Sequence, residues 1–364
     1  MIKITLVAGA RPNFMKIAPI VHAVQSKQKE GFPISYRLVH TGQHYDKKMS
    51  GDFFEQLNIP EPDANLGGGG GTQAEQTASI MVAFEKELMA NRPDLVIVVG
   101  DVTSTLACSI AAKKLVIDVA HVEGGIRSGD LSMPEEINRM VTDSITDHFF
   151  TTSEIANNNL RKLGFSENQI HFVGNTMIDT LMANMEKLKR PEGEVFDGLI
   201  PGQYFVMTMH RPANVDQEEK LKEMINAIME GTQGLPVIFP VHPRTAKNLQ
   251  NLGINDPKLY MTEPLPYLEF NYLVKHAKGV ITDSGGITEE ASVMDVPCIT
   301  LRNNTERAET IELGTNELVG TNPQNLQPYL EKLMRDEWKK YKGIPYWDGK
   351  TAERIVDKII EIYS

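Results

Sequence analysis

The fold is decided by residues 281–291, which read Ile-Thr-Asp-Ser-Gly-Gly-Ile-Thr-Glu-Glu-Ala. The apolar run from Gly279 to Thr282 predicts the end of a buried strand, and Ser284-Gly285-Gly286 then turns the chain into a helix that begins near Ile287. Such a turn directs backbone N–H groups and the positive end of a helix dipole at one place, and its glycines let an anion approach. A phosphate fits there, although an ordinary capped helix explains the same residues.

Glu290 follows Ser284 by six residues and falls in the first turns of this predicted helix. A carboxylate at that place can accept hydrogen bonds from the hydroxyls of a sugar such as ribose. Acids are also common near helix starts because they interact favourably with the dipole. The segment therefore offers partners for a phosphate and a sugar, with an ordinary helix start as the alternative.

Strand and helix patterns alternate along the whole chain, with a pause at residues 187–203, which are rich in Pro, Gly and charge. The expected strands are 2–8, 34–41, 94–99, 116–122, 147–152 and 170–173, then 204–209, 237–241, 259–262, 280–282, 298–301 and 318–319. This alternation predicts an α/β protein with two doubly wound, Rossmann-like parallel sheets facing a cleft. We expect an N-terminal domain of residues 1–174 with a closing helix in 350–364, and a C-terminal domain of residues 175–349.

Composition excludes several classes of function. The net charge is −11 and the sequence pI is about 5.4, so broad electrostatic attraction to nucleic acid or an anionic membrane is not expected. Cys108 and Cys298 are isolated, which argues against a disulfide framework or a zinc site. The first residues lack the pattern of a signal peptide, and no apolar run reaches membrane-spanning length. We expect a cytoplasmic protein.

Basic and polar residues follow the first two strands. Arg11 lies in the turn after the first strand, and Lys16 lies about one turn into the next helix, so both can face one phosphate. A solvated surface position is the alternative for both. Gln43 and His44 follow the second strand, where open α/β sheets place ligands, and their role stays open.

Five consecutive glycines occupy residues 67–71. A run of glycine does not hold one backbone conformation cheaply. The pattern therefore predicts a mobile surface connection.

Acidic residues follow the next two strands. Asp101 comes one glycine after the strand 94–99, and Glu123 comes directly after the strand 116–122. Glu135 lies at the start of the following helix, so all three carboxylates can converge on one crevice. One acid there is explained by helix capping, but three are more than caps require. Carboxylates with perturbed environments donate and accept protons near neutral pH.

The second half also carries polar residues at strand ends. His210-Arg211 follows its first strand, His242-Pro243-Arg244 follows its second, and the segment 302–307 adds two arginines. A lone His at such a position is more often structural. Two of them, each near an Arg, indicate an anionic ligand, and His210 can transfer protons or stabilise departing charge.

Two cofactor motifs are absent from the sequence. No Gly-x-Gly-x-x-Gly follows a strand, so a tightly held NAD is not expected. Gly349-Lys350-Thr351 is not a phosphate-binding loop, because Ile344 stands where that motif has its first glycine. We expect neither cofactor nor metal, so the carboxylates must carry the chemistry.

The chain resembles the non-hydrolysing UDP-N-acetylglucosamine 2-epimerases, a family of GT-B architecture, from the first strand to the closing helix. No single motif is specific, but the set is. The matching motifs are Gly-x-Arg-Pro at 9, Thr-Gly-Gln-His at 41, Gly-Asp at 100, His-Val-Glu at 121, Pro-Glu-Glu-x-Asn-Arg at 134, His-Arg at 210, Pro-Val-His at 240, Asp-Ser-Gly-Gly-Ile at 283 and Asn-Thr-Glu-Arg at 304.

The resemblance implies a role for each candidate residue. The chemistry is implied for Asp101, Glu123, Glu135 and His210, and contact with UDP is implied for Arg11, Lys16, His242, Ser284, Gly285, Gly286, Glu290 and Arg307. The family removes the proton at C2 of the sugar while UDP leaves C1, and rejoins UDP and the glycal with the C2 configuration reversed. Members are commonly homodimers, and some bacterial members are activated by substrate through residues near Gln43 and His44.

Departures from the family pattern leave more than one UDP-sugar as a candidate substrate. Pro212-Ala213-Asn214 follows His210-Arg211, and Gly124 and Ala308 stand where Ala and Pro are usual. Relatives with such changes include 2-epimerases of other UDP-2-acetamido sugars, such as 2,3-diacetamido uronic acids. A GT-B glycosyltransferase that uses a UDP-sugar is a further alternative, because fold alone does not fix function. A UDP-sugar sensor would have no use for the three acids.

Overall fold

The computed structural model describes residues 1–42, 57–215, 217–241, 246, 249 and 252–364. The chain forms two compact units, Met1–Ala183 with Pro345–Ser364, and Asn184–Ile344. The first segment of the first unit ends at Ala183, nine residues after the boundary expected at residue 174. The difference corresponds to helix α7 (Thr176–Asn184), which was not predicted from the sequence. None of the helices in the described ranges is both long and apolar enough to cross a membrane.

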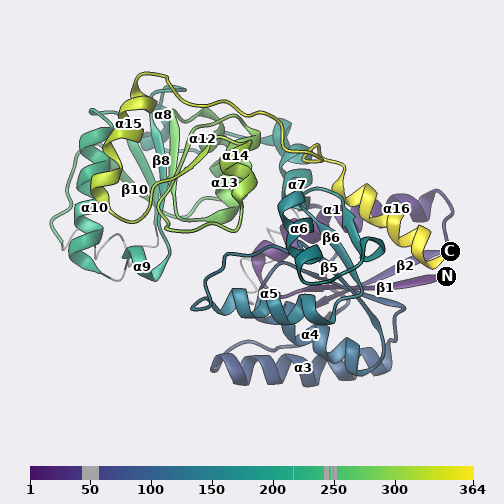
Figure 1. Ribbon diagram of the computed structural model, residues 1–364. Coiled ribbons are helices and arrows are strands. Elements are labelled where there is room, and N and C mark those ends of the chain that lie inside the picture. The colour runs from purple at the N-terminus through teal and green to yellow at the C-terminus, as the bar shows by residue number, and fades with distance from the viewer. Residues whose placement is uncertain (43–56, 216, 242–245, 247–248, 250–251) are drawn as a thin grey trace. The chain divides into compact units, whose positions relative to one another are not determined.

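The first unit is built on a sheet of seven parallel strands (Figure 1). They are β1 (Ile2–Ala8), β2 (Ile34–His40), β3 (Ala64–Asn65), β4 (Leu95–Val99), β5 (Asp118–Val122), β6 (His148–Thr151) and β7 (Ile170–Phe172). Their order is β3-β2-β1-β4-β5-β6-β7. The direction of the connections therefore reverses between β1 and β4, which is where such sheets bind ligands.

Helices of the first unit complete the alternation. They are α1 (Arg11–Lys29), α3 (Gln73–Ala90), α4 (Thr103–Lys114), α5 (Pro134–Ile145), α6 (Glu154–Lys162), α7 and α16 (Thr351–Tyr363). Helices α3, α4 and α5 pack side by side, and the closing helix α16 packs against α1 (Figure 1). All five residues of β4 are buried, as expected for a strand covered on both faces.

The glycine run is packed where it leaves β3. The Gly68 N–H donates to the Thr41 carbonyl at 2.7 Å. A Cβ at Gly68 would lie 2.5 Å from Cγ1 of Ile80, and a Cβ at Gly42 would lie 2.8 Å from Cα of Gly67. The run therefore lets the backbone approach α3 and the end of β2, a packing role that composition alone did not indicate.

The second unit repeats the design with six parallel strands, in the order β10-β9-β8-β11-β12-β13. They are β8 (Phe205–Thr208), β9 (Val237–Pro240), β10 (Leu259–Thr262), β11 (Gly279–Thr282), β12 (Cys298–Thr300) and β13 (Asn316–Leu318). Its helices are α8 (Glu194–Asp197), α9 (Pro212–Val215), α10 (Glu218–Gly231), α12 (Tyr267–His276), α13 (Gly285–Val293), α14 (Ala308–Glu312) and α15 (Gln327–Met334). Here the connections reverse direction between β8 and β11.

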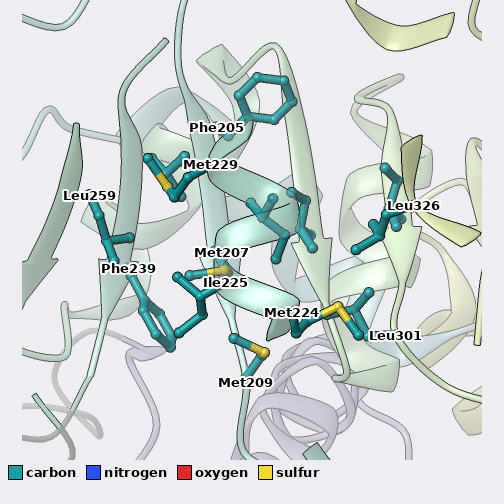
Figure 2. Packing of buried hydrophobic residues seen from close by; sticks show 14 of the residues in the cluster. Phe205, Met207, Met209, Met224, Ile225, Met229, Phe239, Leu259, Leu301 and Leu326 are labelled. Atoms are coloured by element: carbon teal, nitrogen blue, oxygen red, sulfur yellow. The ribbon is translucent and has the colours of Figure 1, made fainter. Parts of the chain in front are cut away.

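The core of the second unit is rich in methionine. Met207 of β8 and Met209, which follows that strand, pack in one cluster with Met224 and Ile225 of α10 and Phe239 of β9 (Figure 2). Methionine fills irregular gaps because its side chain is unbranched and polarizable. This packing fixes α10 against the sheet and leaves the strand ends to carry the polar residues.

The predicted fold class is confirmed by these two parallel sheets. The strands expected from the sequence end within two residues of the observed ones, apart from the short β3, which was not predicted. Helix α13 begins at Gly285, two residues before the expected start at Ile287. The apolar patterns located the elements because the central strands, such as β4, β8 and β11, are buried on both faces.

Asp179 of α7 holds the start of α16. Its carboxylate accepts the backbone N–H groups of Thr351 at 3.1 Å and Ala352 at 2.7 Å. Asp179→Ala should lower the free energy of unfolding of the first unit by about 1–3 kcal/mol, because both donors lose their buried partner. Urea unfolding, followed by the buried Trp347 in a Trp338→Phe background, measures the change.

The matched control is Asp357→Asn in the same helix. Asp357 is exposed and pairs with Lys27 at 2.8 Å, so its loss should cost less than about 1 kcal/mol. Equal effects of the two substitutions would contradict the role given to Asp179.

Candidate functional site

The reversal point of the first sheet is held by Asn13. Its Oδ1 accepts the N–H groups of Gly9 at 3.1 Å and Ala10 at 2.9 Å, and its amide donates to the Val99 carbonyl at 3.1 Å. These bonds tie the turn after β1 to the end of β4. Arg11, which the sequence placed in this turn, is the first residue of α1.

Lys16 and Glu123 form a buried ion pair. Nζ of Lys16 lies 2.8 Å from Oε1 and 2.9 Å from Oε2 of Glu123, and the two side chains are 13% and 4% exposed. Glu123 has φ of 72°, a conformation that side-chain-bearing residues adopt rarely. The structure thus brings Lys16 to one of the predicted acids, a pairing that the sequence did not indicate.

Asp101 is fixed by two residues of α5. Its carboxylate pairs with Arg139, and its backbone carbonyl accepts a hydrogen bond of 2.8 Å from the Asn138 amide. Val102 rather than Asp101 is the N-cap residue of α4, so Asp101 does not serve as the helix cap that the sequence left open. Asp101 follows β4 and Glu123 follows the neighbouring strand β5, whose last residues Val99 and Val122 are paired in the sheet.

Glu135 and Glu136 occupy the first turn of α5 but differ in surroundings. Glu136 is buried, pairs with Arg139 at 2.7 Å and accepts the N–H groups of Ser128 and Gly129, both at 3.0 Å. Burial opposes ionisation of Glu136, but these bonds outweigh it and lower its pKa. Glu135 is half-buried, and its carboxylate has no hydrogen-bond partner among the described residues. Of the two, Glu135 is the acid left available for chemistry.

His121 and Asp143 form a buried pair that was not among the predicted site residues. Nδ1 of His121 lies 2.6 Å from Oδ1 of Asp143, and its Nε2 lies 2.8 Å from the Gly100 carbonyl oxygen. Asp143 also accepts the Gly125 N–H at 3.0 Å and pairs with Arg127 at 2.7 Å. A signal was present, because Asp143 follows Arg139 by four residues, the spacing of one helix face.

Asp283 organises the reversal point of the second sheet. Its buried carboxylate accepts the N–H groups of His210 at 3.0 Å and Arg211 at 2.9 Å, and the Asn214 amide at 2.9 Å. Burial opposes ionisation, but these bonds and the nearby His210 ring outweigh it and lower the pKa of Asp283. The His210 side chain stays 64% exposed, with its Nδ1 3.5 Å from Oδ1 of Asp283.

Ser284 and Gly285 begin α13 at the same edge. The Ser284 side chain makes no capping hydrogen bond, so the capping role that the sequence left open is not what the structure shows. A Cβ at Gly285 would lie 2.9 Å from Oε1 of Glu306, the end of a flexible side chain that can move aside. The start of α13 keeps the N–H groups and dipole that favour an anion.

Glu290 lies one to two turns further along α13 and is buried. The Tyr267 hydroxyl donates to its Oε1 at 2.7 Å. Burial raises the pKa of Glu290 from an ordinary value of 4.5 to about 7, against the smaller opposing effect of its hydrogen bonds. Arg307, the other residue predicted near a ligand, pairs with buried Glu289 at 2.8 Å.

Three predicted site residues lie outside the described residues. They are Gln43, His44 and His242. The remaining candidates fall in two groups. In the first unit, Arg11 and Lys16 lie in α1, Asp101 and Glu123 follow β4 and β5, and Glu135 lies at the start of α5. In the second unit, His210 follows β8, Ser284, Gly285, Gly286 and Glu290 lie at or in α13, and Arg307 precedes α14.

Two sheets of this order, each with charged residues at its reversal point, define an α/β protein of the GT-B-like class. Comparison with known proteins narrows this class. The chain matches the model of the UDP-N-acetylglucosamine 2-epimerase family over residues 26–360. The chain belongs to that family, whose members are isomerases.

Individual relatives align with this chain over nearly its full length. The UDP-N-acetylglucosamine 2-epimerase of Methanocaldococcus jannaschii is 43% identical, with 97% of this chain and 98% of the relative covered. The UDP-2,3-diacetamido-2,3-dideoxy-D-glucuronate 2-epimerase of Pseudomonas aeruginosa is 35% identical, with 99% and 100% covered. The crystal structure of the M. jannaschii UDP-GlcNAc 2-epimerase with UDP-GlcNAc and UDP matches with a TM-score of 0.86 and 42% identity, over 100% of both chains.

Glu290 should titrate near neutrality. In the protein labelled with ¹³C at glutamate side chains, its carboxyl resonance, assigned by its loss in Glu290→Gln, should shift with a midpoint at about pH 7. Exposed Glu75, whose pKa is lowered by its bonds to Thr72, is the internal control and should titrate below 4.5. A Glu290 midpoint at 4.5 would contradict the effect of burial.

The same shift links stability to pH. Because the folded state holds the Glu290 proton more tightly, this group's stabilisation is complete below pH 4.5 and is lost as the pH rises to about 7. Glu290→Gln should therefore flatten the pH dependence of unfolding of the second unit across this window.

Proposed function

We propose that the chain catalyses the reversible epimerisation at C2 of UDP-N-acetylglucosamine to UDP-N-acetylmannosamine. The observation that carries the proposal is the placement of Asp101 and Glu123 at neighbouring strand ends, in a chain that belongs to the 2-epimerase family. The full-length relative from M. jannaschii carries the UDP-N-acetylglucosamine 2-epimerase name. A carboxylate pair at that edge suits proton transfer at a sugar carbon.

The proposed reaction is an elimination followed by its reverse. A base takes the proton from C2, the electron pair of that C–H bond forms the C1–C2 double bond, and UDP departs with the electrons of the C1–O bond. The products held in the site are 2-acetamidoglucal and UDP. In the second step UDP rejoins C1, and C2 receives a proton on the opposite face. Positive charge at C1 in the transition state is stabilised by nearby carboxylates.

We assign the proton transfers to Asp101, Glu123 and Glu135 as a set, without dividing the roles of base and acid among them. Glu135 has a carboxylate without a hydrogen-bond partner in the described ranges, which suits a group that exchanges protons with substrate. Asp101 is held by Arg139 and Glu123 by Lys16, so each has a fixed orientation. His210 would stabilise the departing diphosphate or return a proton.

The UDP moiety is assigned to a second set of residues. The start of α13 would hold the diphosphate through its N–H groups, and Glu290 would accept the ribose hydroxyls. The full proposed set is Arg11, Lys16, His242, Ser284, Gly285, Gly286, Glu290 and Arg307, with Gln43 and His44 as regulatory residues.

A related sugar is the second candidate substrate. The P. aeruginosa relative that acts on UDP-2,3-diacetamido-2,3-dideoxy-D-glucuronate matches this chain over 99% of its length. The same elimination would apply, since the 2-acetamido group and the UDP leaving group are shared. The two substrates differ at C3 and C6, so a direct comparison of rates separates them.

The cellular context is also proposed. Cys108 and Cys298 are buried free thiols, as expected in the reducing cytoplasm. We propose a cytoplasmic homodimer, supported by the family and by apolar side chains exposed along α3, Val82 at 55% and Met89 at 71%. Sedimentation velocity of the full chain tests the dimer, and a monomer at micromolar concentration would contradict it.

The central test is proton NMR of the protein with UDP-N-acetylglucosamine in D₂O, with nothing else added. We expect deuterium at C2 together with UDP-N-acetylmannosamine, because the proton removed exchanges with solvent before its return. If the spectrum does not change, the same experiment with the diacetamido uronate decides between the two sugars. Inactivity on both would refute the proposed function.

Substitution of the acids tests the site. Asp101→Asn and Glu123→Gln should each lower kcat by at least about 100-fold, because proton transfer by a positioned side chain contributes roughly that much. Asp94→Asn is the matched control: Asp94 accepts the Lys3 N–H at 2.8 Å at the other end of β4 and should leave turnover within about 3-fold. Near-normal turnover of the Asp101 and Glu123 variants would remove the site assignment.

A further inference from the structure

His121 is completely buried in β5, and both of its ring nitrogens face oxygen atoms. Nδ1 lies 2.6 Å from the Asp143 carboxylate, and Nε2 lies 2.8 Å from the Gly100 carbonyl oxygen. A carbonyl oxygen can only accept a hydrogen bond, so Nε2 must carry a proton and donate it. Asp143 holds the other side of the ring.

The surroundings of Asp143 favour a charged carboxylate. Its Oδ2 already accepts the Gly125 N–H at 3.0 Å and lies 2.7 Å from the Arg127 guanidinium. Burial opposes ionisation, but the bonds to His121 and the charge of Arg127 outweigh it and lower the pKa of Asp143. Asp143 is thus held in place by Gly125 and Arg127, and its contact with Nδ1 fixes the orientation of the His121 ring.

These bonds join the two loops that carry the predicted acids. Asp143 holds Gly125, two residues after Glu123, while His121 stands two residues before Glu123. Through Nε2 the ring reaches Gly100, the residue that precedes Asp101. Gly100 has φ of 70°, and a glycine can adopt many backbone conformations because it has no side chain. A hydrogen bond to its carbonyl therefore helps to fix the direction in which the chain continues to Asp101.

We infer that His121, anchored by Asp143, positions Asp101 for proton transfer by donating from Nε2 to the Gly100 carbonyl. It is a positioning residue, since it contacts Asp101 only through the backbone. The inference rests on the proposed function in one respect, the participation of Asp101 in the reaction. The bond from His121 to Gly100 stands independently of the substrate.

The spectroscopic test uses the full chain labelled with ¹⁵N at histidine, at pH 7.5. Nε2 of His121, assigned by its loss in His121→Gln, should show the shift of a protonated nitrogen, with its proton protected from solvent exchange. An unprotonated Nε2 would overturn the inference. In Asp143→Asn the ring has lost its anchor, and the protection of the Nε2 proton should weaken.

The kinetic test compares two substitutions. His121→Leu should lower kcat by about 100-fold and change KM by less than about 3-fold, because misplacing a reacting group by about 1 Å costs that much in rate. His121→Gln can still donate to the Gly100 carbonyl and should recover at least about 10-fold of the loss. General weakening of the fold would produce neither this division between kcat and KM nor the rescue.

His148→Leu is the matched control. His148 lies in the adjacent strand β6, is partly buried, and its Nδ1 has no hydrogen-bond partner in the described part of the chain. Its turnover should stay within about 3-fold of the parent protein. Equal kinetics of the His121→Leu and His148→Leu proteins would overturn the inference and leave the proposed function standing. Lack of C2 exchange with both sugars in the parent protein would refute the function, and the nitrogen spectrum would still decide whether Nε2 donates to the Gly100 carbonyl.

Discussion

Parallel strand pairing is the constraint on which both candidate sites depend. Every pair in the two sheets is parallel, so all strands of a sheet end at the same edge. Both faces of such a sheet are covered, and a strand like β4 is therefore apolar and buried throughout. Polar residues are confined to the points where strands stop, and the reversal of the connections at β1/β4 and β8/β11 leaves room there for a ligand. Asp101 and Asp283 stand at these two points for the same topological reason.

Helix α5 converts this edge into a defined arrangement of charges. Arg139 and Asp143 lie on one face of the helix, four residues apart, and reach the ends of two different strands. Arg139 holds the Asp101 carboxylate, while Asp143 holds His121 and the turn after Glu123. Both charged residues are buried and paired, which is the condition under which charges are tolerated inside a protein. One rigid element thus fixes both acid-bearing loops, as precise proton transfer requires.

The second unit shows how surroundings give two buried acids opposite character. Asp283 accepts hydrogen bonds from three groups, and its pKa is lowered despite burial. Glu290 lies seven residues later in the same segment. Burial raises its pKa to about 7, and the Tyr267 hydroxyl donates a hydrogen bond to it. The number of donors separates the two cases. Asp283 therefore serves as a fixed anion that shapes the turn at His210, whereas Glu290 can change its charge near neutral pH.

The sequence by itself determined the elements, the two parallel sheets and the family, because apolar periodicity and short motifs are local properties. It also placed Asp101, Glu123, His210 and Ser284 at strand ends, since each lies within two residues of the end of a predicted strand. Tertiary structure alone decided the partners. Lys16 meets Glu123 across 107 positions of the chain, and the role of Gly68 rests on its approach to Ile80. The bonds of His121 to Asp143 and Gly100 likewise emerged only in the folded chain. Such pairings depend on which strands become neighbours and how closely their ends approach, and burial then sets the charge of each group.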